Sequence, residues 1–170
     1  MEYLIIGLGN PGNEYLHTRH NLGFIFVDFI VNKLGLNSND FSFNKNFNAE
    51  ILKYNTILFL KPMTFMNNSG YSVSKAINYY DFKNIYLIYD DLDLHLGDFK
   101  IGEKSPKSHN GVISTKEQIN QEFISIRIGI NSDRNPNITG ADYVLGKISK
   151  EEQEILITVF ENIIKQLTFL

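Results

Sequence analysis

Cysteine is absent from this chain of 170 residues. Its absence excludes disulfides, cysteine-ligated zinc, iron–sulfur clusters and a cysteine nucleophile, and it fits a reducing cytoplasm. No apolar run approaches the roughly 20 residues that a helix needs to cross a bilayer. The start, Met-Glu-Tyr-Leu-Ile-Ile-Gly, lacks the basic region of a secretory signal. We therefore expect a cytoplasmic protein without a membrane segment.

Charge of one sign is not in large excess. Lys and Arg number 16, Asp and Glu number 19, and the formal net charge is −3. This balance argues against a protein coated with basic side chains for non-specific duplex binding, but it allows a local basic patch. Hydrophobic residues (43%) and charged residues (21%) have ordinary globular proportions. At this length we expect residues 1–170 to form one domain.

Hydrophobic periodicity predicts strands and helices that alternate along the chain. The predicted strands are 3–8, 47–53, 56–61, 85–89, 99–101 and 123–130, with a hairpin turn at 54–55 and a loop over 37–46. The predicted helices are 22–34, 69–80, 112–119 and the segment from 150 to 167, with N-caps at Asn21, Ser69 and Ser149 and a capping box between Ser149 and Glu152. This order predicts a single α/β domain with a mixed, mostly parallel twisted sheet flanked by helices. Ligands of such sheets bind beyond the carboxyl ends of strands, so we expect the site in the loops after Leu8, Lys61 and Tyr89.

The loop after the first predicted strand, residues 7–12, matches the dinucleotide-binding pattern G-x-G-x-x-G, with Asp28 as the ribose-binding acid. In that fold the helix begins at the glycines, so that its N–H groups bind pyrophosphate. Here residues 13–21 separate Gly12 from the helical pattern. Because glycines also serve a tight turn, a nucleotide cofactor is the weaker interpretation and we expect none.

Two of the four histidines, His17 and His20, precede a predicted helix N-terminus. That position disfavours the imidazolium ion, so a histidine there tends to be neutral, as a general base must be. A nearby carboxylate favours the charged form and fixes the tautomer. Asp90, Asp91 and Asp93, at the end of a predicted central strand, are candidates for that carboxylate. The alternative without chemistry is a histidine that caps or packs beside acids of a solvated loop.

A metal site is a further alternative. His17 and His20 could surround a metal with Asp90, Asp93 or His95. Neither H-E-x-x-H nor a cysteine partner occurs, so we expect no metal. The serine-hydrolase pattern G-x-S-x-G is absent as well.

Seven short segments follow one another over nearly the whole chain. They are Gly-Leu-Gly-Asn10-Pro-Gly-Asn-Glu-Tyr15, Thr-Arg-His20-Asn-Leu-Gly, Lys-Pro-Met-Thr-Phe65-Met-Asn67-Asn-Ser-Gly, Asp90-Asp-Leu-Asp93-Leu, Ser-His109-Asn110-Gly, Arg127-Ile-Gly-Ile and Asp142-Tyr-Val-Leu-Gly. In this order the chain resembles the bacterial-type peptidyl-tRNA hydrolase family. The resemblance implies hydrolysis of the ester between a peptide and the 3′-terminal ribose of tRNA, which recycles tRNA from stalled translation. It also implies no cofactor, no metal and a monomer.

The resemblance assigns roles to particular residues. His20 is the general base that activates water, Asp90 keeps it basic and oriented, and Asn10 distinguishes N-acylated from free aminoacyl esters. A neutral amide nitrogen can donate to Asn10, whereas a free α-amine is charged and hydrated. The expected contacts to the tRNA 3′ end and the adjoining peptide backbone are Tyr15, Phe65, Met66, Asn67 and Asn110. The rival hypothesis is an RNA-binding relative without turnover, which has no need of a His and carboxylate pair.

Two features depart from the family pattern. A glycine-rich run before His-Asn-Gly is replaced by the more charged residues 102–109, and the chain ends at Leu170, so we expect no basic tail. Because tRNA is a polyanion, a local patch must offset the negative net charge. We predict that patch at Lys100, Lys104 and Lys107, with Arg127 or Arg134 as a further member.

Overall fold

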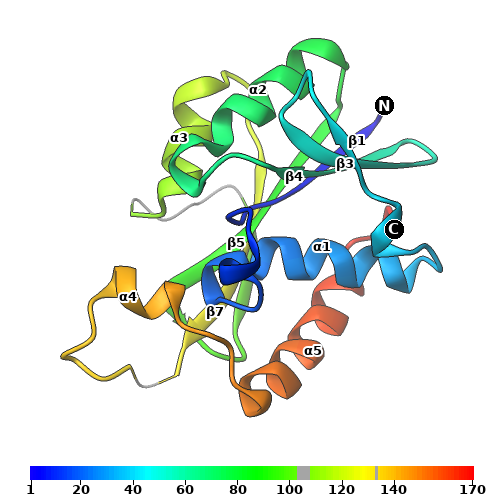
Figure 1. The fold of residues 1–170 in the computed structure, drawn as a ribbon. Coiled ribbons are helices and arrows are strands. Elements are labelled where there is room, and N and C mark those ends of the chain that lie inside the picture. The colour runs from blue at the N-terminus through cyan, green and yellow to red at the C-terminus, as the bar shows by residue number, and fades with distance from the viewer. Residues whose placement is uncertain (103–107, 133) are drawn as a thin grey trace.

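The computed structural model describes residues 1–102, 108–132 and 134–170, and in these ranges seven strands form one sheet with the order β2-β3-β4-β1-β5-β7-β6 (Figure 1). The strands are β1 (Tyr3–Gly7), β2 (Ser42–Asn44), β3 (Ala49–Tyr54), β4 (Ile57–Pro62), β5 (Asn84–His95), β6 (Phe99–Gly102) and β7 (Ile124–Asn131). β1 pairs in parallel with β4 and β5, and β5 pairs in parallel with β7. The pairs at both edges are antiparallel. The predicted single-domain α/β fold with a mixed sheet is therefore confirmed.

Helices cover both faces of the sheet, with α1 and α5 on one side and α2 and α3 on the other (Figure 1). The α-helices are α1 (Leu22–Lys33), α2 (Ser69–Tyr79), α3 (Asn110–Gln118), α4 (Gly140–Leu145) and α5 (Lys150–Ile164). Short 3-10 turns are η1 (Asn13–Tyr15), η2 (Arg19–Asn21), η3 (Ser38–Asp40) and η4 (Met66–Asn68). Side chains alternate along a strand, so Leu4 and Ile6 enter the cluster under α2 and α3, whereas Ile5 enters the cluster under α1 and α5.

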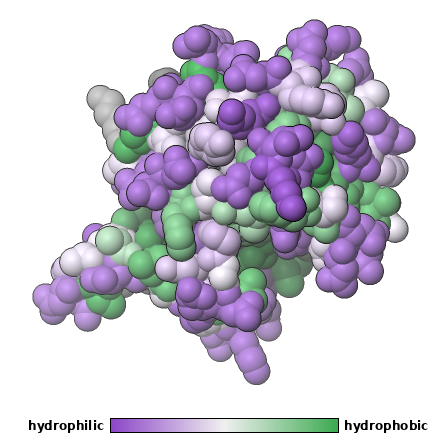
Figure 2. Space-filling view, turned by 45° about the horizontal axis from the view of Figure 1, so that its top comes forward, coloured by the Kyte–Doolittle hydropathy of each residue, from purple (hydrophilic) through white to green (hydrophobic). Residues whose placement is uncertain are grey.

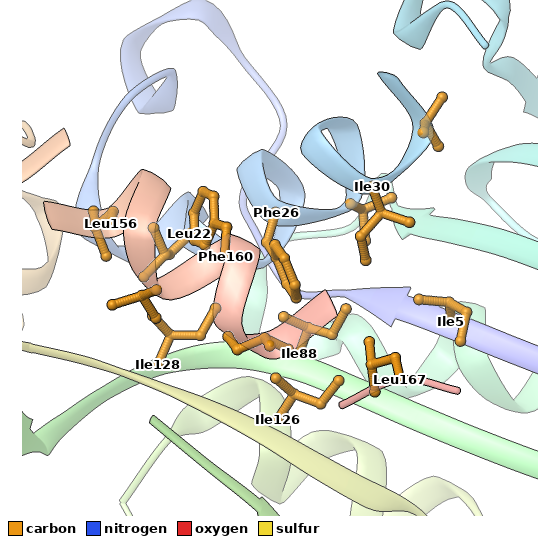
Figure 3. Packing of buried hydrophobic residues seen from close by; sticks show 14 of the residues in the cluster. Ile5, Leu22, Phe26, Ile30, Ile88, Ile126, Ile128, Leu156, Phe160 and Leu167 are labelled. Atoms are coloured by element: carbon orange, nitrogen blue, oxygen red, sulfur yellow. The ribbon is translucent and has the colours of Figure 1, made fainter. Parts of the chain in front are cut away.

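The cluster between α1, α5 and the sheet is apolar and closely packed (Figure 3). Phe26 of α1 and Phe160 of α5 lie with ring centroids 4.8 Å apart, above Ile88 and Ile128 of the central strands. Outside the core, hydrophilic residues dominate the face shown in Figure 2, with hydrophobic residues between them. Among the described residues, no helix has the length and apolar character needed to cross a bilayer.

Several local expectations differ from the structure. The predicted loop 37–46 contains η3 and β2, and α4 was not predicted because its six residues carry little periodicity. Ser149 and Glu152 form the predicted capping box at α5. Ser69 is the first residue of α2 and not its N-cap, and its hydroxyl donates to the Met66 carbonyl. Asn21 precedes α1, but its side chain makes no capping hydrogen bond because it binds elsewhere.

Candidate active site

Two loops and the strand β5 meet near the carboxyl-terminal edge of the parallel strands. β1 leads into the loop that holds Asn10, and β4 leads into η4. Asp90 directly follows the apolar run 85–89 but lies within β5, which continues to His95, so the loop expected after Tyr89 is not found there. These strands are parallel neighbours, so their carboxyl ends share one edge of the sheet. The turn η2, just before α1, brings His20 to the same edge. The sequence analysis predicted the candidate site at this edge, and His20 and Asp90 meet there.

His20 and Asp90 are in direct contact. The His20 Nδ1 atom lies 3.0 Å from Asp90 Oδ1 and 3.1 Å from Oδ2. The Asp90 side chain is 2% exposed, and that of His20 is 12% exposed. A carboxylate only accepts hydrogen bonds, so Nδ1 carries the proton and donates it to Asp90. In the neutral ring, Nε2 is then the atom with the free electron pair.

A second histidine, His109, lies on the same carboxylate. Its Nε2 is 3.0 Å from Asp90 Oδ1, and its ring centroid lies 4.9 Å from that of His20. His109 is also the N-cap of α3, where its Nδ1 accepts a long hydrogen bond of 3.4 Å from the Val112 N–H. Because Nδ1 is the acceptor there, Nε2 carries the proton and donates it to Asp90. We did not single out His109 from the sequence, and its only signal was its place in the segment Ser-His109-Asn110-Gly.

Charge and burial act in opposite directions on this cluster. Burial lowers the pKa of His20, but the charge of Asp90 and the hydrogen bond to it outweigh burial, so that the pKa is raised from its usual value. Burial raises the pKa of Asp90, while the charges and hydrogen bonds of His20 and His109 lower it, and the net shift is strongly downward. Asp90 is therefore a carboxylate at neutral pH, and His20 is a stronger base than a free imidazole.

Asn10 is held from two sides. Its backbone N–H donates to Asn21 Oδ1 at 2.9 Å, and Asn21 Nδ2 donates back to the Asn10 carbonyl at 2.9 Å. The Asn10 Oδ1 atom accepts the Met66 N–H at 2.8 Å. We expected a substrate N–H to donate to this oxygen, which already accepts a hydrogen bond from the protein. Because the Met66 N–H needs an acceptor, its hydrogen bond fixes which end of the Asn10 amide is Oδ1 and which is Nδ2.

The other expected contact residues lie around these groups. The rings of Tyr15 and Phe65 meet edge to face with centroids 6.2 Å apart, and Phe65 is 58% exposed. Asn67 of η4 and Asn110, the first residue of α3, are exposed. Met66 is only 4% exposed, so its side chain is buried. It contributes to the site through its backbone N–H, which donates to Asn10 Oδ1. Exposed rings and amides near a buried base form a surface that can bind bases and peptide groups.

Only part of the predicted basic patch lies within the described residues. Lys100 is exposed on β6, whereas Lys104 and Lys107 lie outside the described residues. Arg127 donates from Nε to Asp91 Oδ2 at 2.6 Å, and both side chains are largely buried. The expectation that Arg127 is available for phosphate is therefore not met, because its guanidinium binds within the sheet. Arg134 is partly buried.

The structure gives the glycines of the first loop another explanation than phosphate binding. A Cβ on Gly7 would lie 2.4 Å from the Gly23 carbonyl oxygen, and a Cβ on Gly9 would lie 2.6 Å from the Phe24 ring. These glycines allow α1 to cross β1 closely. Asp28, the expected ribose-binding acid, forms an ion pair with Lys61. The geometry thus gives no support to a dinucleotide site.

A group of possible metal ligands exists, and it shares His20 and Asp90 with the alternative in the sequence analysis. Within the described part of the chain, the ligand atoms of His20, Asp90 and His109 lie within 4.8 Å of one another. His17, Asp93 and His95 are not part of this group. The two contacts of 3.0 Å to Asp90 Oδ1 have hydrogen-bond lengths.

Known proteins are similar to this chain in sequence and fold. The family model described as peptidyl-tRNA hydrolase matches residues 4–170. A curated peptidyl-tRNA hydrolase of Clostridium botulinum (strain Eklund 17B / Type B) is 42% identical over 158 residues, which are 91% of this chain and 81% of that protein. One from Fusobacterium nucleatum subsp. nucleatum is 40% identical over 164 residues, covering 94% and 84%. The crystal structure of peptidyl-tRNA hydrolase from Acinetobacter baumannii superposes with a TM-score of 0.81 at 30% identity, covering 95% of this chain and 83% of that one.

Proposed function

The chain belongs to the peptidyl-tRNA hydrolase family, and on that premise we propose that it hydrolyses the ester between peptide and tRNA with His20 as the general base. The observation that supports this role is the contact of 3.0 Å between His20 Nδ1 and the buried Asp90 carboxylate. It leaves Nε2 as the proton acceptor and raises the pKa of the ring. A binding protein without turnover has no use for a base prepared in this way.

The proposed reaction moves one proton twice. His20 Nε2 takes a proton from a water molecule as the water oxygen bonds to the ester carbonyl carbon. The imidazolium ion that forms is stabilised by Asp90, which stays ionised. When the bond between that carbon and the ribose oxygen breaks, His20 returns the proton to the ribose oxygen. The products are the free peptide acid and tRNA, and no metal or cofactor enters the sequence of steps.

Asn10 supports selection of N-acylated substrates in a way that follows from its hydrogen bonds. Its Oδ1 accepts the Met66 N–H, so Nδ2 is the donor that it offers to a ligand. An N-acylated residue has an acyl carbonyl oxygen that can accept from Nδ2. A free aminoacyl ester has a cationic ammonium group, which can only donate. The Asn10 Nδ2 donor forms no hydrogen bond with this ammonium group, and both groups lose hydration when they meet. The ester of a free amino acid therefore binds poorly.

The remaining residues suit a substrate whose peptide sequence varies. Asn67 and Asn110 offer amides to backbone groups, and the exposed ring of Phe65, in contact with Tyr15, offers a face on which the terminal base can stack. Lys100 and the lysines of residues 103–107 would neutralise acceptor-stem phosphates, an effect that salt dependence of tRNA binding measures. We expect the enzyme to act as a monomer in the cytoplasm.

The test compares N-acetyl-aminoacyl-tRNA with unblocked aminoacyl-tRNA in the presence of EDTA. The wild type should release the acyl group from the blocked ester alone, and His20→Ala should lose about 10²- to 10⁴-fold in rate while tRNA binding remains. His95→Ala removes an exposed histidine of β5 and serves as the matched control. A folded wild type that binds tRNA but releases no peptide would favour the RNA-binding alternative. Loss of activity with EDTA would overturn the metal-free mechanism.

A further inference from the structure

The turn that carries His20 is bound to a distant part of the chain. The Arg19 N–H donates to the Gly146 carbonyl at 3.0 Å, and the Ile148 N–H donates to the His17 carbonyl at 2.9 Å. Between them, Thr18 and Lys147 form an isolated antiparallel bridge. The backbone before His20 is thus paired with the segment that leads into α5. Its position depends on that segment as well as on α1.

The side chain of Arg19 makes this connection strong. Its Nη2 lies 2.9 Å from both carboxylate oxygens of Glu152, and its Nε lies 3.3 Å from Oε1. Nη1 donates to the Tyr143 carbonyl at 3.4 Å, and the guanidinium carbon lies 4.3 Å from the centroid of the Tyr143 ring. The side chains of Arg19 and Glu152 are only 14% and 10% exposed. Planar, multiply bonded Arg–carboxylate pairs of this kind fix orientation as well as distance.

Glu152 is itself held rigidly. It accepts the Ser149 N–H at 2.8 Å as part of the capping box and the Ser132 hydroxyl at 3.0 Å. That hydroxyl lies 2.8 Å from the Tyr143 hydroxyl, which donates to the Ile130 carbonyl at 2.9 Å. The network joins the end of β7, α4 and the start of α5. Arg19 therefore binds a fixed point and not a mobile surface acid.

Close packing supports the same conclusion. A Cβ on Gly146 would lie 2.7 Å from Arg19 Nη1, so the segment leaves no space beside the guanidinium. We propose that Arg19 and Glu152 are positioning residues of the hydrolysis, which hold η2 so that His20 Nδ1 stays 3.0 Å from Asp90. The inference rests on the general-base role proposed above for His20.

A measurable consequence follows for His20. In the described structure, Asp90 and His109 are the titratable groups in contact with its ring. Burial lowers the pKa of His20 and Asp90 raises it. If η2 shifts while the His20 ring stays buried, the contact with Asp90 weakens, and the pKa of His20 should fall together with kcat. Because both positioning side chains are largely buried and bound to each other, KM should change little.

The experiment uses two conservative variants. Arg19→Lys keeps the charge but loses the planar set of donors, and Glu152→Gln keeps an acceptor for the capping box but loses the carboxylate. Misplacement of a catalytic group by about 1 Å can cost 10²-fold, so we expect kcat for N-acetyl-aminoacyl-tRNA to fall roughly 10- to 100-fold, with KM within about threefold. NMR titration of the His20 ring should give a lower pKa in both variants.

Glu161→Gln is the matched control, because Glu161 also belongs to α5 and also forms an ion pair to a neighbouring element, through Lys33 of α1. It should leave kcat and the His20 pKa unchanged. An equal loss in Glu161→Gln, or wild-type kcat and His20 pKa in Arg19→Lys, would overturn the inference. If Glu152→Gln fails to fold, Ser132→Ala weakens the network more gently and should show a smaller shift of the same sign. Full activity of His20→Ala would instead refute the proposed base, a distinct result.

Discussion

Replacing Asp90 by Asn tests the charge beside the base while preserving shape. The carboxylate raises the pKa of His20 against the lowering effect of burial. Without it the pKa should fall below its usual value, so the acid limb of the pH–rate profile should move to lower pH. The rate above that limb should fall too, because the imidazolium ion formed during the reaction loses its counter-charge.

The size of the rate loss follows from the contacts. A hydrogen bond to a charged group contributes about 1.5–3 kcal/mol, and each 1.36 kcal/mol is tenfold in rate, so we expect a loss of about 10- to 150-fold. The loss grows if the new Nδ2 takes the place of Oδ2, which lies 3.1 Å from His20 Nδ1. Its N–H would then favour the tautomer that is protonated at Nε2, which cannot accept a proton from water.

The assay is peptide release from N-acetyl-aminoacyl-tRNA at a series of pH values for wild type and Asp90→Asn. Asp98→Asn, an exposed acid between β5 and β6, is the control for the loss of a negative charge. An unchanged profile in Asp90→Asn, or an acid limb that moves to higher pH, would refute the reasoning. Such a result would mean that Asp90 does not set the basicity of His20.

Three further predictions concern packing, selectivity and acid stability. Gly23→Ala should destabilise the fold by at least about 1–3 kcal/mol in chemical denaturation, because its Cβ would lie 2.3 Å from the Leu8 nitrogen. Asn10→Asp keeps the acceptor for the Met66 N–H but replaces the Nδ2 donor, so the ratio of blocked to unblocked ester cleavage should fall roughly tenfold or more. The pKa of Glu152 is lowered, since its hydrogen bonds and Arg19 outweigh burial, so its stabilisation should be present above the unfolded pKa and lost as pH falls through the folded one. In acid unfolding, the stability of Glu152→Gln should not show this decrease as the pH falls.

The sequence predicted the place of the site because the place depends on topology. Alternating strands and helices imply a parallel sheet, and loops after parallel strands share an edge, so the encounter of His20 with Asp90 could be expected. The capping box at Ser149 could be predicted because its pattern is local. The caps expected at Ser69 and Asn21 rest on equally local patterns, but they do not form, because these side chains bind other groups.

Other contacts between distant elements could not be predicted in this way. His109 reaches Asp90 because the start of α3 lies beside the middle of β5 in space, and histidine is not a typical N-cap. The side chain of Asn21 was expected to cap α1, but the Asn10 backbone competes for it. Arg19 and Glu152 are 133 residues apart, and no periodicity links them. Such pairs depend on three-dimensional packing.

The most direct test of the central claim is a single-turnover measurement of peptide release from N-acetyl-aminoacyl-tRNA by wild type and His20→Ala, at enzyme concentrations that saturate binding. Saturation removes differences in affinity, so the rate reports the chemical step. The account predicts a rate about 10²- to 10⁴-fold lower in His20→Ala, with the substrate still bound. A variant that releases peptide at the wild-type rate would contradict it.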